Sequence, residues 1–157
     1  MSLRFGILTL SDRSAKGERA DASGPALAEL IRAQGWSVVK QAILPDDESA
    51  IRAALTEWAD GDEVDVILTT GGTGFAPRDV TPEATRAVIQ REAPGLAEAM
   101  RADSLKKTPH AMLSRAVAGI RGRTLIINLP GSPKGAVENL QTVLPVLPHA
   151  IQLLTDD

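Results

Sequence analysis

The sequence predicts a three-layer α/β/α domain with a mostly parallel sheet and one antiparallel hairpin strand. Short apolar runs alternate with amphipathic helical segments through residues 4–69, and this β-α-β-α-β order is typical of a parallel sheet with right-handed crossovers. Two later apolar runs are separated only by residues 121–123, which is too short for anything but a hairpin. The length of 157 residues fits one domain, so we expect residues 1–157 to form a single unit.

Three apolar runs in the first half are typical of buried strands, and they span residues 4–10, 36–44 and 64–69. The first helix is expected to have Ser23 as its N-cap and Pro25 in its first turn, and to end at Gly35. The second follows residues 45–47 and presents Ile51 and Leu55 on its apolar face.

The second half is expected to contain two helices, two strands and a long final helical region, at residues 82–92, 94–105, 116–120, 124–129 and 136–154. Pro145 and Pro148 lie inside the last of these. A proline cannot donate the helical hydrogen bond, so we expect a break or kink there.

Composition excludes several classes of function. The chain has no cysteine, which rules out disulfides, thiolate metal sites and cysteine nucleophiles. His110 and His149 lie 39 positions apart, and nothing pairs them on a metal. The net charge of −3 argues against a nucleic-acid partner. No apolar stretch approaches the roughly 20 residues of a membrane span, and there is no signal-peptide pattern, so a cytoplasmic protein is expected.

Four unusual loops follow the predicted strands, at residues 11–13, 45–47, 69–74 with 77–79, and 128–135. In an open parallel sheet, ligands bind beyond the carboxyl ends of the strands. If all four strands are parallel, these loops meet at one edge of the sheet. Their convergence indicates a ligand site more strongly than any single loop does.

The glycine loop is the first component of this site. Gly71, Gly72 and Gly74 let backbone N–H groups approach an anion, and Thr70 and Thr73 add hydroxyl donors. A tight turn is the commoner explanation of such a loop taken alone. The loop matches neither the dinucleotide fingerprint nor the P-loop, so a phosphate or pterin cradle of another type is left open.

Two aspartates that each follow a strand are candidate magnesium ligands. Mg²⁺ favours one or two carboxylates together with substrate phosphates and water, and Asp46 and Asp79 are placed to supply them. Singly, Asp46 is better explained as a helix N-cap and Asp79 as a turn residue. Jointly, their position beside a glycine loop favours a functional role, and Asp12 belongs to the same group.

Phosphate donors are expected in the second half of the chain. Gly131, Ser132 and Lys134 precede a helix, where backbone N–H groups and the helix dipole favour anions. Of the basic residues in this half, Arg78 and Lys134 lie inside the candidate loops. Ser104 and Ser114 are further candidate donors, although serines more often serve as caps.

Two blocks of this sequence, residues 69–74 and 78–85, resemble the signature of molybdopterin-binding proteins of the MogA/MoaB type, which include the G domain of gephyrin. Residues 104–106, 111–115 and 128–134 are similar to further blocks of that family, so the resemblance covers essentially the whole chain. It implies a homotrimer of α/β domains with molybdopterin adenylyltransferase activity, ATP and molybdopterin as substrates, and hand-over of the product to a molybdenum insertase.

The resemblance also implies roles for individual positions. Asp46 and Asp79 match the family's two catalytic carboxylates, and Ser114 matches a serine of its pterin site. The ligand-binding loop corresponds to Gly71, Gly72, Thr73 and Gly74. Residues that align near the pocket are Asp12, Ser104, Arg115, Asn128 and Ser132.

The hypothesis is that a phosphate of molybdopterin attacks the α-phosphorus of ATP while Mg²⁺ near Asp46 and Asp79 offsets the phosphate charge. One alternative is a nicotinamide-dependent oxidoreductase, although residues 8–12 contain no glycine where the dinucleotide fingerprint would begin. The other is a non-catalytic pterin-binding carrier or scaffold, which would bind pterin without ATP turnover.

Overall fold

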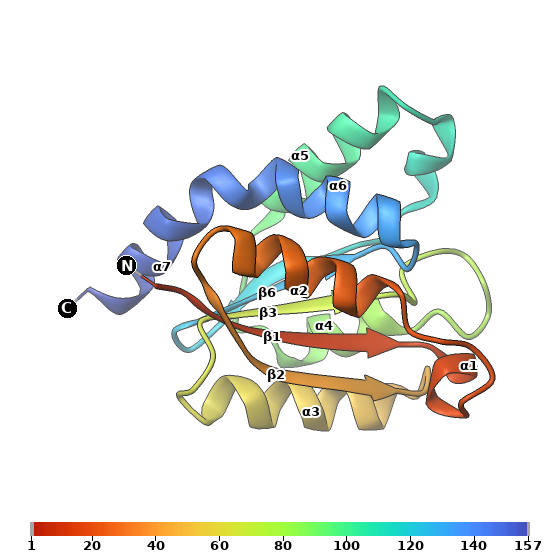
Figure 1. Cartoon of the computed structure of the whole chain (residues 1–157), viewed down its shortest axis with the longest axis horizontal. Coiled ribbons are helices and arrows are strands. Elements are labelled where there is room, and N and C mark those ends of the chain that lie inside the picture. Colours follow the sequence, from red (N-terminus) through yellow and green to blue (C-terminus); the bar gives the residue numbers. More distant parts are fainter. Residues whose placement is uncertain (1, 157) are drawn as a thin grey trace.

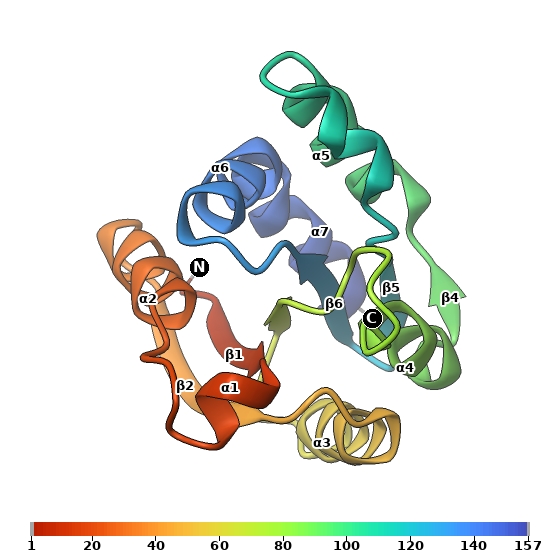
Figure 2. The same ribbon diagram turned by 90° about the vertical axis from the view of Figure 1, so that its right-hand side faces the viewer.

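Six strands form one mixed sheet in the order β2-β1-β3-β6-β5-β4 (Figures 1 and 2). The structure is a computed structural model and describes residues 2–156. Strands β1, β2, β3 and β6 run parallel, whereas β5 is antiparallel to β6 and β4 is antiparallel to β5. The strands are β1 (Arg4–Leu10), β2 (Ser37–Leu44), β3 (Val66–Thr70), β4 (Arg91–Glu92), β5 (Ala118–Arg121) and β6 (Thr124–Leu129).

Helices cover both faces of the sheet, as Figure 2 shows, and confirm the predicted three layers. One face packs against α2 (Ser23–Ala33), α5 (Pro94–Leu105), α6 (Pro133–Val143) and α7 (Leu147–Thr155). The other packs against α3 (Glu48–Asp60) and α4 (Thr81–Val88). No helix within residues 2–156 combines the length and the apolar character that crossing a bilayer requires.

The central strands are buried on both faces, which explains why they appear in the sequence as continuous apolar runs. Along β3, Leu68 faces the α2 side and Ile67 faces the α3 side. The edge strand β2 instead alternates between exposed and half-buried positions. The buried centre therefore holds β1, β3 and β6 in a fixed register, and this register sets the positions of the loops that follow them.

The predicted helix over residues 82–92 is wrong at its C-terminal end. Helix α4 stops at Val88, and residues 91–92 form β4 at the edge of the sheet. The Gln90 N–H donates to the Ile120 carbonyl at 2.7 Å, and the Ala93 N–H donates to the Ala118 carbonyl at 2.9 Å. Pairing with β5 therefore satisfies backbone groups that the helix would otherwise have satisfied.

Two smaller differences from the predicted elements concern the start of α2 and an additional short helix. Ser23 is the first residue of α2 rather than its cap, because the Asp21 carboxylate accepts the Gly24 N–H at 3.1 Å. The loop after β1 also contains a four-residue helix, α1 (Asp12–Ala15), which the sequence did not predict. The predicted break near Pro145 is confirmed, since the 3-10 turn η2 (Leu144–Val146) separates α6 from α7.

Candidate active site

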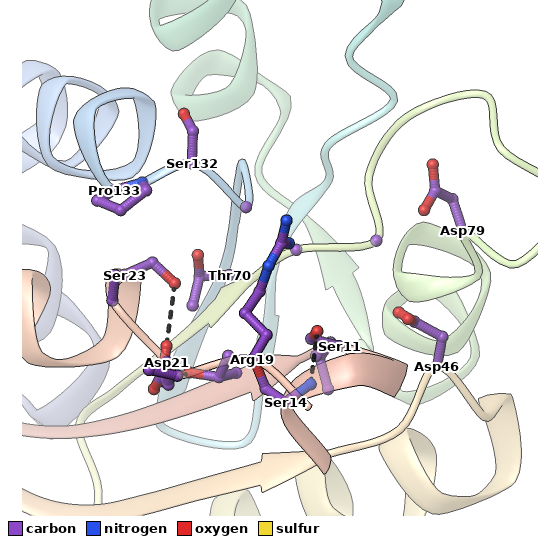
Figure 3. Close-up of a pocket in the computed structure, with 17 residues that line it drawn as sticks. Ser11, Ser14, Arg19, Asp21, Ser23, Asp46, Thr70, Asp79, Ser132 and Pro133 are labelled. Carbon is purple, nitrogen blue, oxygen red and sulfur yellow. Dashed lines mark hydrogen bonds between the residues drawn. The ribbon is translucent and has the colours of Figure 1, made fainter. Parts of the chain in front are cut away.

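A cavity of about 560 Å³ opens at the carboxyl ends of the parallel strands (Figure 3). Its lining includes residues that follow β1, β2, β3 and β6, which confirms the predicted convergence of four loops. Among the expected site residues, it brings together Asp46, Gly71, Gly72, Asp79, Gly131 and Ser132. The segment that leads into α2 supplies a further wall through Arg19, Asp21 and Ser23.

The glycine loop follows β3 directly and requires its glycines. Gly71 and Gly72 have φ values of +106° and +69°, a region that L side chains rarely adopt. A Cβ on Gly71 would lie 2.3 Å from the Leu10 carbonyl oxygen, and one on Gly72 would lie 2.4 Å from Thr81 Oγ1. The absence of side chains therefore lets this backbone lie against its neighbours and form the cavity floor.

Only one of the two carboxylate oxygens of Asp46 is hydrogen-bonded. Its Oδ2 accepts the Asp12 N–H at 3.1 Å, whereas the buried Oδ1 has no hydrogen-bond partner. Burial is the main cause that raises the pKa of Asp46, and the neighbouring carboxylates of Asp12 and Asp79 add to it. The alternative role as helix cap is wrong, because Asp47 caps α3 by accepting the Ala50 N–H at 2.9 Å.

Asp79 lies on the same cavity and also stabilises its own loop. Its Oδ2 accepts the Ala76 N–H at 3.0 Å, as in an Asx-type turn. Its Oδ1 makes no hydrogen bond to any residue of the described chain. Asp79 therefore combines the predicted turn role with an oxygen that remains available to a ligand.

Asp12 and Arg78 pair with each other beside the cavity. The Arg78 Nε and one terminal nitrogen both lie 2.9 Å from the Asp12 carboxylate oxygens. This guanidinium is the main cause that lowers the pKa of Asp12. Because Asp12 Oδ1 also accepts the Asp46 N–H at 3.0 Å, the pair anchors the residue that carries the free carboxylate oxygen. Neither member lines the cavity.

A second cavity of about 350 Å³ adjoins the first on the α5 side. Ser132 lines both cavities, which places them next to each other. Apolar groups such as Met100 and Leu113 form much of its wall. Besides Ser132, four expected site residues lie on it, namely Thr73, Gly74, Ser104 and Ser114.

Arg115 and Asn128 line neither cavity. Asn128 is fully buried in the sheet, and its amide donates to the hydroxyls of Thr69 and Thr85 at 2.9 Å each. The Arg115 guanidinium donates to the Gly74 and Asp79 carbonyls at 2.7 and 2.8 Å. Arg115 therefore holds the loop that borders the cavities, and Asn128 ties the sheet to α4. Their assignment to substrate binding stays a prediction.

Lys134 also lies away from both cavities. Its side chain is 89% exposed, and its ammonium is 3.9 Å from Glu138, one turn further along α6. The basic residue that reaches the first cavity is instead Arg19, which sequence reasoning missed. Its only signal in the sequence was a place in a charged loop after the first strand, a feature that many surface loops share.

The chain is similar to known proteins over nearly its whole length. The family model described as "Probable molybdopterin binding domain" matches residues 6–149. The molybdenum cofactor synthesis protein cinnamon of Drosophila melanogaster is 48% identical over 99% of this chain, which spans 26% of that longer protein. A molybdopterin adenylyltransferase of Helicobacter pylori strain J99 is 43% identical, over 98% of this chain and 88% of that protein.

A solved structure also has a fold very similar to that of this chain. The molybdopterin biosynthesis enzyme MoaB from Thermus thermophilus matches with a TM-score of 0.92 and 56% identity, over 98% of this chain and 96% of that one. Sequence and fold both point to the same group of proteins. The chain therefore belongs to the molybdopterin-binding domain family.

Proposed function

We propose that this chain is a molybdopterin adenylyltransferase of molybdenum cofactor biosynthesis, which transfers AMP from ATP to the phosphate of molybdopterin and releases pyrophosphate. The observation that carries the proposal is the buried, unpartnered Oδ1 of Asp46 on the same cavity as Asp79. A buried carboxylate oxygen without a partner destabilises the free protein. Its presence is explained if a ligand supplies the missing partner.

The residues of the first cavity fit a magnesium ion. Asp46 and Asp79 each offer a carboxylate oxygen with no protein donor, and hard oxygen ligands are those that Mg²⁺ prefers. No cluster of three or more potential metal-binding side chains occurs within residues 2–156, so phosphates and water would have to supply the remaining ligands. When bound, Mg²⁺ would offset negative charge on the reacting phosphates.

The chain itself would position the two substrates. The glycine loop exposes backbone at the cavity floor, where phosphate oxygens can approach closely. Ser132 Oγ accepts the Gly135 N–H at 3.1 Å, which leaves its own O–H free to donate to a phosphate between the two cavities. We place the nucleotide in the first cavity and the pterin in the more apolar second one, with their reacting phosphates meeting near Ser132.

The reaction then needs no protein nucleophile. An oxygen of the molybdopterin phosphate forms a bond to the α-phosphorus of ATP, and the bond from that phosphorus to the bridging oxygen of pyrophosphate breaks. Such transfers depend on alignment and on neutralising charge, which suits a cavity that contains neither cysteine nor histidine.

Pyrophosphate release from ATP, measured with and without molybdopterin, tests the proposal. Release only when both substrates are present is the expected result. Tight pterin binding without any release would instead identify a non-catalytic carrier or scaffold. A fluorescence titration that detects binding of NAD(H) would revive the oxidoreductase alternative.

The proposal includes three features of the cellular protein. We propose a homotrimer, a cytoplasmic location, and hand-over of the adenylylated product to a molybdenum insertase. Sedimentation at micromolar concentration tests the first, because a trimer is expected to sediment well ahead of a 16.6 kDa monomer. A monomer would contradict the proposed assembly and leave the proposed chemistry standing.

A further inference from the structure

Arg19 is the sole lysine or arginine among the described residues that line the first cavity. It belongs to the segment between α1 and α2, and Figure 3 shows its side chain reaching from that segment into the cavity, with the guanidinium between Ser132 and the two aspartates Asp46 and Asp79. The residue as a whole is exposed to solvent, so its guanidinium is accessible to a ligand that enters the cavity.

No protein group supplies this partner. Within residues 2–156 the Arg19 guanidinium makes neither a hydrogen bond nor an ion pair. The two basic residues that the sequence favoured behave differently, since Arg78 is held by both oxygens of Asp12 and Lys134 lies 3.9 Å from Glu138. Neither of them lines the cavity. Arg19 is thus the cation that remains free for an anionic ligand.

The charge of the cavity makes such a cation necessary for a polyphosphate. Asp21, Asp46 and Asp79 place three carboxylates on its lining, against the single guanidinium of Arg19. Asp21 already accepts hydrogen bonds from the Thr9 hydroxyl at 2.9 Å and from the Gly24 N–H at 3.1 Å. Its charge nevertheless remains and repels phosphate. Magnesium would act at the other two carboxylates, so Arg19 is the group that can attract phosphate oxygens elsewhere on the lining.

We propose that Arg19 is a substrate-binding residue that donates hydrogen bonds to the phosphate chain of the nucleotide. This inference rests on the proposed function and specifies how an acidic cavity holds ATP. A guanidinium offers several donors in a planar fork that matches phosphate oxygens. Contact with the phosphates, and not with the base or ribose, also means that Arg19 distinguishes ATP from adenosine.

Binding measurements with Arg19→Gln test this assignment. Affinities for ATP and for adenosine are measured by calorimetry in the presence of Mg²⁺, without molybdopterin. ATP affinity is expected to fall about tenfold, the lower end for a lost charge-assisted hydrogen bond, because the guanidinium is partly hydrated. Adenosine affinity is expected to stay within about twofold. Arg19→Lys keeps the charge and should recover part of the ATP affinity.

Arg32→Gln is the matched control, because Arg32 is an exposed arginine at the end of α2 that lines neither of the two cavities described above. It removes the same charge and should leave both affinities unchanged. Melting temperatures of all three variants should match the unsubstituted protein, since Arg19 supports no protein contact. ATP affinity of Arg19→Gln within twofold of the unsubstituted protein would overturn the inference, as would an equal loss for adenosine.

Turnover separates this inference from the proposed function. If the unsubstituted protein releases pyrophosphate with molybdopterin and Arg19→Gln does so with an unchanged KM for ATP, only the assignment of Arg19 fails. If the unsubstituted protein releases none, the proposed function fails, and the ATP binding data still decide whether Arg19 holds phosphate.

Discussion

Asp46→Asn should make the protein more stable while it removes activity. The buried Oδ1 of Asp46 has no hydrogen-bond partner, and its burial raises the pKa of the carboxyl. Asparagine leaves this buried position without a partner but removes its charge. A buried charge without a partner costs more than a neutral polar group, by an amount on the order of the 1–3 kcal/mol that an unsatisfied group costs. Because the rest of this carboxyl is half-buried, we expect a gain near the lower limit, about 1 kcal/mol. Asparagine keeps an oxygen that can accept the Asp12 N–H.

Thermal and denaturant unfolding as a function of pH measure this effect. A gain of about 1 kcal/mol raises the melting temperature of a domain of this size by about 2–4 °C. The raised pKa means that the folded protein binds this proton more tightly than the unfolded chain does. The unsubstituted protein therefore loses stability as the pH rises from 3.8, the ordinary value, through the raised pKa. The advantage of asparagine should be largest at neutral pH and should shrink as the pH falls toward 3.8.

Mg²⁺ provides the complementary arm of this experiment. Magnesium alone should raise the melting temperature of the unsubstituted protein, because it binds the folded state, and should leave Asp46→Asn unaffected. An asparagine variant that is less stable at neutral pH, or whose advantage grows in acid, would refute the reasoning. In that case the buried oxygen must be satisfied in the free protein.

Two further substitutions probe the same cavity. Asp79→Asn keeps an acceptor for the Ala76 N–H, so the melting temperature of this variant should stay unchanged. Single-turnover AMP transfer should fall roughly a hundredfold or more, because about 3 kcal/mol of transition-state stabilisation is lost. Transfer near the original rate would make Asp79 only a turn residue. Gly72→Ala should lower the free energy of unfolding by about 3 kcal/mol, because its Cβ would meet Thr81 Oγ1 at 2.4 Å on a φ of +69°. Gly17→Ala is the control, because Gly17 has a φ of +77° with open space around it. This substitution should lower the free energy of unfolding by only about 1 kcal/mol. Equal losses of stability in the two variants would show that crowding at Gly72 is unimportant.

The parts of the fold that could be predicted are those with strong periodicity. The apolar runs that became β1, β3 and β6 are buried on both faces, so burial and sequence pattern coincide. Strand β4 could not be predicted, because its two exposed residues carry no apolar pattern and pair only with β5. The cap of α2 was misassigned because the helix begins at Ser23 itself, with Ala22 at the N-cap position, and the carboxylate that accepts the Gly24 N–H belongs to Asp21.

The same distinction applies to the site. Residues that directly follow strands, such as Asp46 and Gly72, were predictable because topology places them at the cavity. Asn128 also ends a strand, but its side chain points into the sheet, an orientation that depends on the register with β3. Arg19 lies nine residues beyond the end of β1 in a loop without periodicity, so only the three-dimensional path of that loop brings it to the cavity.

Transfer of the α-phosphate of ATP to molybdopterin is the measurement that tests the central claim most directly. ATP labelled at the α-phosphate is incubated with the protein and molybdopterin, first with Mg²⁺, then with EDTA in excess, and finally with Mg²⁺ restored. We expect label on the pterin with Mg²⁺, none in EDTA, and recovery when the ion is returned. Undiminished transfer in EDTA would contradict the metal role of Asp46 and Asp79, and saturating pterin binding without any labelled product would contradict the adenylyltransferase itself.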